Sequence, residues 1–163
     1  MLALFQLPEY NLDDIDIDGF SLVIDSISDP GNLGTIIRLC DWFGIKNIFC
    51  SPNTVDCFNP KVIQSTMGSI ARVRCYYVDL LPIIENYDSM VYAATLDGNS
   101  HYHEFFTSNG LLVIGNESHG ISDELLKKIE NRVSIPSRTG NVGPESLNVA
   151  TATAILLSEI FRP

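Results

Sequence analysis

Short apolar segments alternate with helix-like segments along this chain, and this alternation constrains its fold more than any other feature. The short segments are rich in β-branched and aromatic residues, as strands are, and they lie at 21–27, 47–50, 73–78, 90–95, 111–114 and 133–135. The segments between them carry apolar residues at helical spacing, at about 33–43, 60–69, 80–86, 122–130 and 147–161. This order predicts an α/β domain with a mostly parallel sheet flanked by helices. Ligands of such sheets bind beyond the carboxyl ends of the strands, so the loops at those ends are the candidate sites.

The composition fits a single globular domain. The chain has 163 residues, of which 45% are hydrophobic and 18% charged, which suffices for one core. No apolar run is long enough to predict a membrane span, and the opening MLALFQL is too short and too poor in basic residues for a signal peptide. The cysteines form no CxxC pair, which favours buried, reduced thiols in a cytoplasmic protein and no metal site: Cys40, Cys50, Cys57 and Cys75.

The charge of the chain bears on its partners. A net charge of −10 argues against a broad electrostatic grip on nucleic acid. Four of the acids stand in NLDDIDID, residues 11–18, which is typical of a solvated linker. We therefore expect residues 1–19 to form an N-terminal linker and residues 20–163 to form the folded domain.

The segment DPGNLGTIIR, residues 29–38, follows the first predicted strand and opens a helix. Proline and glycine after Asp29 suit a type II turn, which would make Asn32 the N-cap. Arg38 falls outside the apolar stripe and should point away from the core, while Gly34 would let a ligand or a second backbone approach closely. The segment is neither a P-loop nor a dinucleotide fingerprint. A plain turn and cap with a surface arginine is the alternative.

A second polar turn lies in LLVIGNESHG, residues 111–120, where a buried strand ends. Gly115 would permit close approach of a ligand to the backbone. Glu117 is either functional or a cap for the helix that starts near Ser122. The three histidines are expected to be exposed, with a proton shuttle as the alternative for the last: His101, His103 and His119.

The third unusual segment runs from Ile135 through a glycine-rich loop to Ser146 and Asn148, and then into a nearly all-apolar helix. Ser146 could cap that helix. The amide of Asn148, just inside an apolar helix, would then need a partner that capping does not explain. Small residues in the helix would allow close packing against another element: Ala150, Thr151, Thr153 and Ala154.

Together these segments resemble the SpoU family of RNA ribose methyltransferases, also called the TrmH family, within the SPOUT superfamily. The matching stretches are 29–44, 112–122 and 135–157, with weaker similarity at 54–73, and the resemblance covers roughly residues 20 to 160. It implies an α/β fold whose C-terminal part forms a deep trefoil knot. It also implies a homodimer that binds S-adenosylmethionine and methylates the 2′-hydroxyl of a ribose in ribosomal or transfer RNA.

The resemblance assigns roles residue by residue. The catalytic set that it implies is Asn32, Arg38, Glu117, Ser146 and Asn148. The cofactor-binding set that it implies is Gly115, Ile135 and Leu147, with Thr95 and Leu96 as weaker candidates. In the family the arginine is proposed as the base. A guanidinium with a pKa above about 12 is a demanding base, so we expect Arg38 to grip an RNA phosphate and orient the hydroxyl.

Several alternatives stay open at this point. A SPOUT enzyme that methylates a base, a non-catalytic RNA-binding module of the same fold, and an unrelated nucleotide-binding α/β protein are the rival functions. Many family members carry a separate N-terminal RNA-recognition domain. The opening MLALFQLPEY is typical of an inter-domain junction, so we expect this sequence to be a piece of a longer protein rather than a minimal member.

Overall fold

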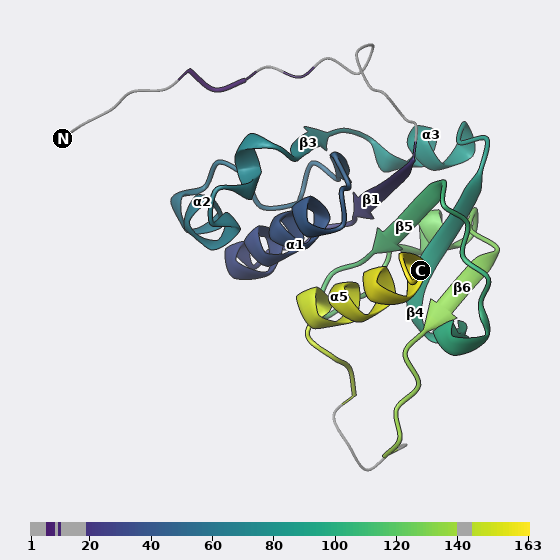
Figure 1. The fold of residues 1–163 in the computed structure, drawn as a ribbon. Coiled ribbons are helices and arrows are strands. Elements are labelled where there is room, and N and C mark those ends of the chain that lie inside the picture. The colour runs from purple at the N-terminus through teal and green to yellow at the C-terminus, as the bar shows by residue number, and fades with distance from the viewer. Residues whose placement is uncertain (1–5, 9, 11–18, 140–144) are drawn as a thin grey trace.

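The computed structural model describes residues 6–8, 10, 19–139 and 145–163, and its strands form one parallel sheet (Figure 1). The sheet has six strands in the order β3-β2-β1-β5-β4-β6, and each adjacent pair is parallel. The strands are β1 (Phe20–Ile24), β2 (Asn47–Cys50), β3 (Arg74–Tyr77), β4 (Met90–Ser100), β5 (Gly110–Ile114) and β6 (Asn131–Ser134). The helices are α1 (Pro30–Trp42), α2 (Pro60–Thr66), α3 (Leu80–Glu85), α4 (Asp123–Leu126) and α5 (Val149–Ile160), with 3₁₀ turns η2 (Ser69–Ala71) and η3 (His101–His103).

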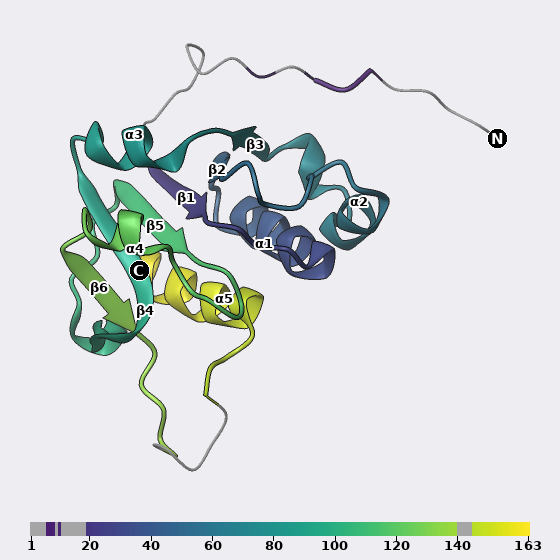
Figure 2. The same cartoon turned by 180° about the vertical axis from the view of Figure 1, so that it is seen from behind.

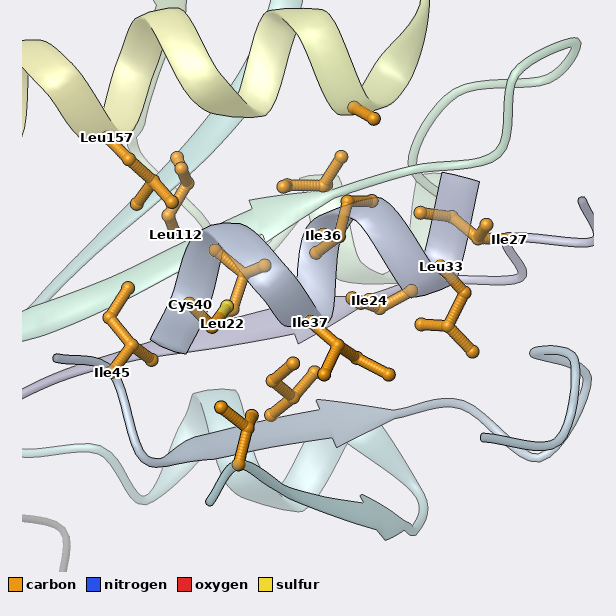
Figure 3. Close-up of a cluster of buried hydrophobic side chains, with 14 of the residues drawn as sticks. Leu22, Ile24, Ile27, Leu33, Ile36, Ile37, Cys40, Ile45, Leu112 and Leu157 are labelled. Carbon is orange, nitrogen blue, oxygen red and sulfur yellow. The ribbon is translucent and has the colours of Figure 1, made fainter. Parts of the chain in front are cut away.

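Helices cover both faces of the sheet. Along β1, successive side chains point to opposite faces, so Leu22 and Ile24 join one buried cluster while Val23 joins the other. Helices α1, α2 and α5 lie over one face of the sheet (Figure 1), and α3 and α4 lie over the other (Figure 2). Side chains of the first cluster pack between the sheet, α1 and α5 (Figure 3), and the second cluster includes residues of α3 and α4. In the first cluster, Ile36 of α1 and Leu157 of α5 are fully buried. The predicted α/β fold with a mostly parallel sheet is confirmed.

Helix α1 begins earlier than the sequence predicts, and its cap differs. The N-cap is Asp29, whose side chain accepts a hydrogen bond from the backbone N–H of Asn32 at 2.8 Å. Pro30 takes the first helical position, where its fixed φ suits a helix and its missing N–H costs nothing. The predicted type II turn with Asn32 as N-cap is therefore wrong, and the side chain of Asn32 is left for another contact.

The cap of α5 also differs from the prediction. Asn148, not Ser146, is the N-cap, and its Oδ1 accepts hydrogen bonds from the N–H groups of Ala150 and Thr151 at 3.0 and 3.2 Å. Asparagine and serine are equally good caps, so local sequence does not choose between the two positions. The tertiary contact described below decides in favour of Asn148.

Close backbone approach explains two further features. A Cβ on Gly34 would collide with the side chain of Ser65 and lie 2.8 Å from the carbonyl of Val62, so this glycine lets α1 and α2 pack together. Strand β4 extends five residues beyond the predicted end at Thr95, because its distal part pairs again with β6 after a register shift. A Cβ on Gly98 would lie 2.6 Å from the β6 backbone, so only glycine fits there.

Two expectations concern parts of the chain that the structure does not fully describe. Most of the predicted linker 1–19 and part of the loop before α5, residues 140–144, lie outside the described residues. The linker and the C-terminal knot therefore stay predictions. None of the helices within the described residues is long and apolar enough to cross a membrane.

Candidate active site

Three side chains from the three unusual segments form one hydrogen-bonded chain. The side-chain amide of Asn148 donates to Oδ1 of Asn32 at 2.9 Å. The amide of Asn32 in turn donates to Oε1 of Glu117 at 2.7 Å. These partners are 116 and 85 positions apart in the sequence. The fold thus brings three of the five predicted catalytic residues into direct contact.

The two ends of this chain fix its direction. Glu117 as a carboxylate only accepts, while the N-terminal N–H groups of α5 only donate to Asn148. Each amide between these ends accepts on one side and donates on the other, so a single orientation of both amides satisfies every contact. Oxygen and nitrogen of an amide are normally assigned from such a network, and here the network leaves no second solution.

The sheet explains why these residues meet. Ile24 at the end of β1 pairs with Ile114 at the end of β5. The loops that follow the two strands therefore leave the carboxyl edge of the sheet side by side, and α1 packs directly against α5. Asn32 lies in the first turn of α1 and Asn148 caps α5, so both helix N-termini open at this edge.

Arg38 lies on α1, about 9 Å along the helix axis from Asn32. Its side chain is exposed and makes no hydrogen bond or ion pair with any of the described residues. The prediction that it points away from the core is confirmed. Ser146 is also exposed, two residues before Asn148, and it makes no hydrogen bond within the described parts of the chain.

The predicted cofactor-binding residues present a buried hydroxyl and apolar surface. Oγ1 of Thr95 is buried and has no hydrogen-bond partner among the described residues. Leu96 and Leu147 expose 76% and 46% of their surfaces, and Ile135 packs half-buried against the core. An unpaired buried hydroxyl is uncommon in a folded protein. An unpaired hydroxyl and apolar side chains are the kinds of group that an adenosyl ligand needs, since it requires a few hydrogen bonds and apolar walls.

One hydroxyl joins two segments that carry predicted cofactor-binding residues. Oγ of Ser134, at the end of β6, donates to the carbonyl oxygen of Gly98 at 2.7 Å. This bond joins the β4 segment that follows Thr95 to the strand end that precedes Ile135.

The fold of the polypeptide itself requires a glycine at position 115. A Cβ there would collide with the backbone of Gly120 and Ile121. Asn116 and Gly120 exchange two backbone hydrogen bonds of 2.9 Å, which close a tight turn against Gly115. The expected approach of a ligand to Gly115 stays a prediction, since this turn already accounts for the glycine.

The three histidine side chains differ in solvent exposure. His103 and His119 are exposed, as predicted, and Nδ1 of His119 lies 3.2 Å from Oδ1 of Asn116. The prediction for His101 is wrong, because its side chain is 2% exposed and its Nδ1 lies 3.1 Å from the carbonyl oxygen of Ser134. The 3₁₀ turn η3 packs against α5, which buries the ring.

Sequence reasoning missed a polar group behind the candidate site. Asp25, Ser26 and Ser51 follow the ends of β1 and β2, and Asn116 follows β5, and these residues are linked by hydrogen bonds. The aspartate at position 25, inside the apolar run 21–27, was the available signal.

Comparisons with known proteins agree with this geometry. The sequence pattern of the SpoU rRNA Methylase family matches residues 19–158 of the chain. The 23S rRNA (guanosine(2553)-2′-O)-methyltransferase RlmP of Bacillus subtilis is 35% identical over 140 residues, which are 83% of this chain and 55% of that protein. The 23S rRNA (uridine(2479)-2′-O)-methyltransferase of Streptomyces viridochromogenes is 28% identical over 99% of this chain and 60% of its own length.

A solved structure gives the same fold. The AdoMet-bound rRNA methyltransferase from Sinorhizobium meliloti matches with a TM-score of 0.87 and 30% identity, over 97% of this chain and 62% of that one. The present chain thus spans between half and two thirds of the length of these relatives.

Proposed function

Because this chain belongs to the SpoU rRNA methylase family, we propose that it transfers a methyl group from S-adenosylmethionine to a ribose 2′-hydroxyl in ribosomal or transfer RNA. The observation that carries this proposal is the directed chain from Asn148 through Asn32 to Glu117. It joins three loops at the edge of the sheet where ligands of parallel sheets bind. The relatives from Bacillus subtilis and Streptomyces viridochromogenes are 2′-O-methyltransferases of ribosomal RNA, which supports the same reaction here.

The residues present suit the proposed cofactor. We assign Thr95, Leu96, Gly115, Ile135 and Leu147 to binding S-adenosylmethionine. The unpaired hydroxyl of Thr95 supports this assignment, since a bound ligand would give it a partner. When bound, the cofactor supplies an electrophilic methyl group on a sulfonium centre.

The protein's part in the reaction is to position the ribose. Holding a nucleophile close to its target can supply much of a rate enhancement. Asn32, Glu117 and Asn148 present a preorganised polar surface for the ribose, and Ser146 stands next to it. Preorganised groups need little rearrangement during the reaction, which makes them effective.

Arg38 supplies the positive charge in this proposal. Its guanidinium can make two parallel hydrogen bonds to a phosphate, and it is exposed without an ion-pair partner among the described residues. We assign Arg38 to gripping an RNA phosphate and orienting the adjacent hydroxyl. Because a guanidinium stays protonated in proteins, the 2′-hydroxyl proton in this proposal passes to water rather than to Arg38.

The partners and the location belong to the same proposal. We propose a homodimer that works on RNA in the cytoplasm, with a further N-terminal segment that recognises the RNA. Trp42 exposes 85% of its surface near the end of α1, which is consistent with a protein interface. The four cysteines are free and buried, which is consistent with a reducing compartment.

The first test is calorimetric titration with S-adenosylmethionine and S-adenosylhomocysteine, with ATP as the control ligand. We expect saturable binding of both adenosyl ligands and none of ATP. A folded protein that binds neither adenosyl ligand would contradict the cofactor assignment and favour a non-catalytic module.

The second test maps the methyl group. RNA is incubated with the protein and labelled S-adenosylmethionine, digested with nucleases and analysed by mass spectrometry. A methylated ribose is expected, whereas a methylated base would favour the rival SPOUT reaction. Arg38→Ala should abolish transfer. The matched control is Arg162→Ala at the far end of α5, where an exposed arginine pairs with Glu159 at 3.1 Å, and it should keep full activity.

A further inference from the structure

Two consecutive residues after β1 hold both ends of the turn that carries Glu117. Oδ2 of Asp25, whose side chain is buried, accepts a hydrogen bond from the N–H of Ser122 at 2.8 Å. The carbonyl oxygen of Ser26 accepts one from the side-chain amide of Asn116 at 2.7 Å. The turn from Asn116 to Ser122 is therefore anchored to β1 at its start and at its end.

Ser26 has the backbone conformation that makes this double anchor possible. Its φ of 61° lies in the left-handed region, which residues other than glycine rarely adopt. Three hydrogen bonds hold it there: its N–H donates to Oγ of Ser51 at 2.8 Å, its hydroxyl donates to Oδ1 of Asp25 at 2.9 Å, and its carbonyl accepts from Asn116. An unusual conformation that is held by several contacts is a common feature of functional sites.

Both the nitrogen and the oxygen of the Asn116 side-chain amide form hydrogen bonds. Its Nδ2 donates to Ser26, while its Oδ1 accepts from the N–H groups of Ser118 and His119 at 2.9 and 3.2 Å. Glu117 lies between these contacts, and its own carboxylate points to Asn32. The amide of Asn116 thus determines where the backbone of Glu117 stands relative to β1.

We propose that Asn116 is a positioning residue for methyl transfer, which acts by holding Glu117 at the distance that orients Asn32. The proposal rests on the function proposed above and adds to it a residue outside the assigned catalytic set. Asn116 contacts no member of that set through its side chain; its effect passes through the backbone of the turn.

Asn116→Asp tests the proposal, because it changes one contact selectively. The carboxylate can still accept from Ser118 and His119, but it places an acceptor against the carbonyl of Ser26. We expect kcat to fall by about tenfold to a hundredfold, the effect of a small misplacement in an active site, while KM for RNA changes less than about threefold. Asn116→Ala, which removes the donor without adding a charge, should lower kcat in the same way and serves if the first variant does not fold.

The decisive readout is the combination with Glu117→Ala, which removes the acceptor for Asn32, whereas a glutamine would keep it. If Asn116 acts through Glu117, then Asn116→Asp should lower kcat in the native background but have little further effect in the Glu117→Ala background. If Asn116→Asp lowered kcat by the same factor in both backgrounds, the proposal would be overturned. An Asn116→Asp variant with native kcat would overturn it too.

A matched control separates this result from a general loss of stability. Asn86→Asp adds the same charge and removes a similar amide-to-carbonyl bond, 2.8 Å to Pro82 at the end of α3, and should leave kcat unchanged. Unaltered protein that methylates no RNA would refute the proposed function itself, whereas active native protein with a fully active Asn116→Asp variant would refute only this inference.

Discussion

Replacing Asn148 tests whether one side chain both caps α5 and directs the site. Asn148→Ala removes the cap of α5 and the hydrogen bond to Asn32. The cap contributes about 1 kcal/mol, and the exposed amide bond contributes about 1 kcal/mol more. We therefore expect the free energy of unfolding to fall by about 2 kcal/mol, which corresponds to a Tm lower by about 4–8 °C for a domain of this size.

Asn148→Asp should separate the two roles. Aspartate caps a helix as well as asparagine does, and its charge is favourable at a helix N-terminus by about 0.3–1 kcal/mol. The second carboxylate oxygen, however, would face Oδ1 of Asn32, which is also an acceptor. Asn32 cannot turn its amide around, because its Nδ2 is needed by Glu117. We expect stability within about 1 kcal/mol of the native protein, with methyl transfer reduced as strongly as in Asn148→Ala.

Stability is measured by urea unfolding, monitored by circular dichroism. Activity is measured separately as the transfer of a labelled methyl group to RNA. Asn59→Ala is the matched control, since Asn59 caps α2 by accepting from Lys61 at 2.9 Å and takes no part in the hydrogen-bonded chain. It should lose stability without losing activity. The reasoning is refuted if Asn148→Asp keeps native activity, or if it is destabilised as much as Asn148→Ala.

Three further predictions concern the fold. Gly34→Ala should destabilise the protein by about 1–3 kcal/mol, measured by urea unfolding, because the new methyl group meets Ser65 in a packed helix contact. The Arg72 guanidinium, with help from the Ser69 hydroxyl, holds the pKa of Asp41 below its usual value. A carboxyl group whose pKa is lowered by folding stabilises the folded state at pH values above its unfolded pKa, and this stabilisation is lost as the pH falls through its folded pKa. The difference in stability between the native protein and Arg72→Ala should therefore be present at pH 7 and shrink on acidification below the ordinary aspartate pKa of about 3.9. The four free cysteines are all buried, and burial is the largest cause of the raised pKa of the Cys40 thiol, so a thiol reagent such as dithionitrobenzoate should label none of them in the native protein and all four after unfolding.

The elements themselves were predictable because their signals are local. Every predicted strand and helix is present, most within three residues of its expected ends. One exception has a tertiary cause. Strand β4 continues through Leu96 to Ser100, a stretch whose polar and glycine residues favour a loop, because the distal part pairs with β6. The other exception is the helix expected at 122–130, which ends at Leu126 in α4.

The caps show a different limit of local reasoning. At the start of α1, both Asp29 and Asn32 are good cap residues, and at α5 both Ser146 and Asn148 are. At each helix only one of the two residues is the N-cap, and the hydrogen bonds among Asn32, Glu117 and Asn148 explain which one. Asn32 is released from capping and bonds Glu117, while Asn148 caps with its oxygen and bonds Asn32 with its nitrogen.

The residue types of the site follow from this geometry, although the sequence alone could not show it. The register that pairs Ile24 with Ile114 places the β1 and β5 loops side by side, and nothing local to either loop encodes that neighbour. Once the loops meet, a chain that starts at helix N–H donors and ends at a carboxylate needs members that accept on one side and donate on the other. A carboxylate cannot donate and an ammonium cannot accept, whereas an amide does both at fixed geometry. The arrangement that ends at Glu117 therefore needs side chains that accept and donate at once, and the amides of Asn32 and Asn148 meet this need.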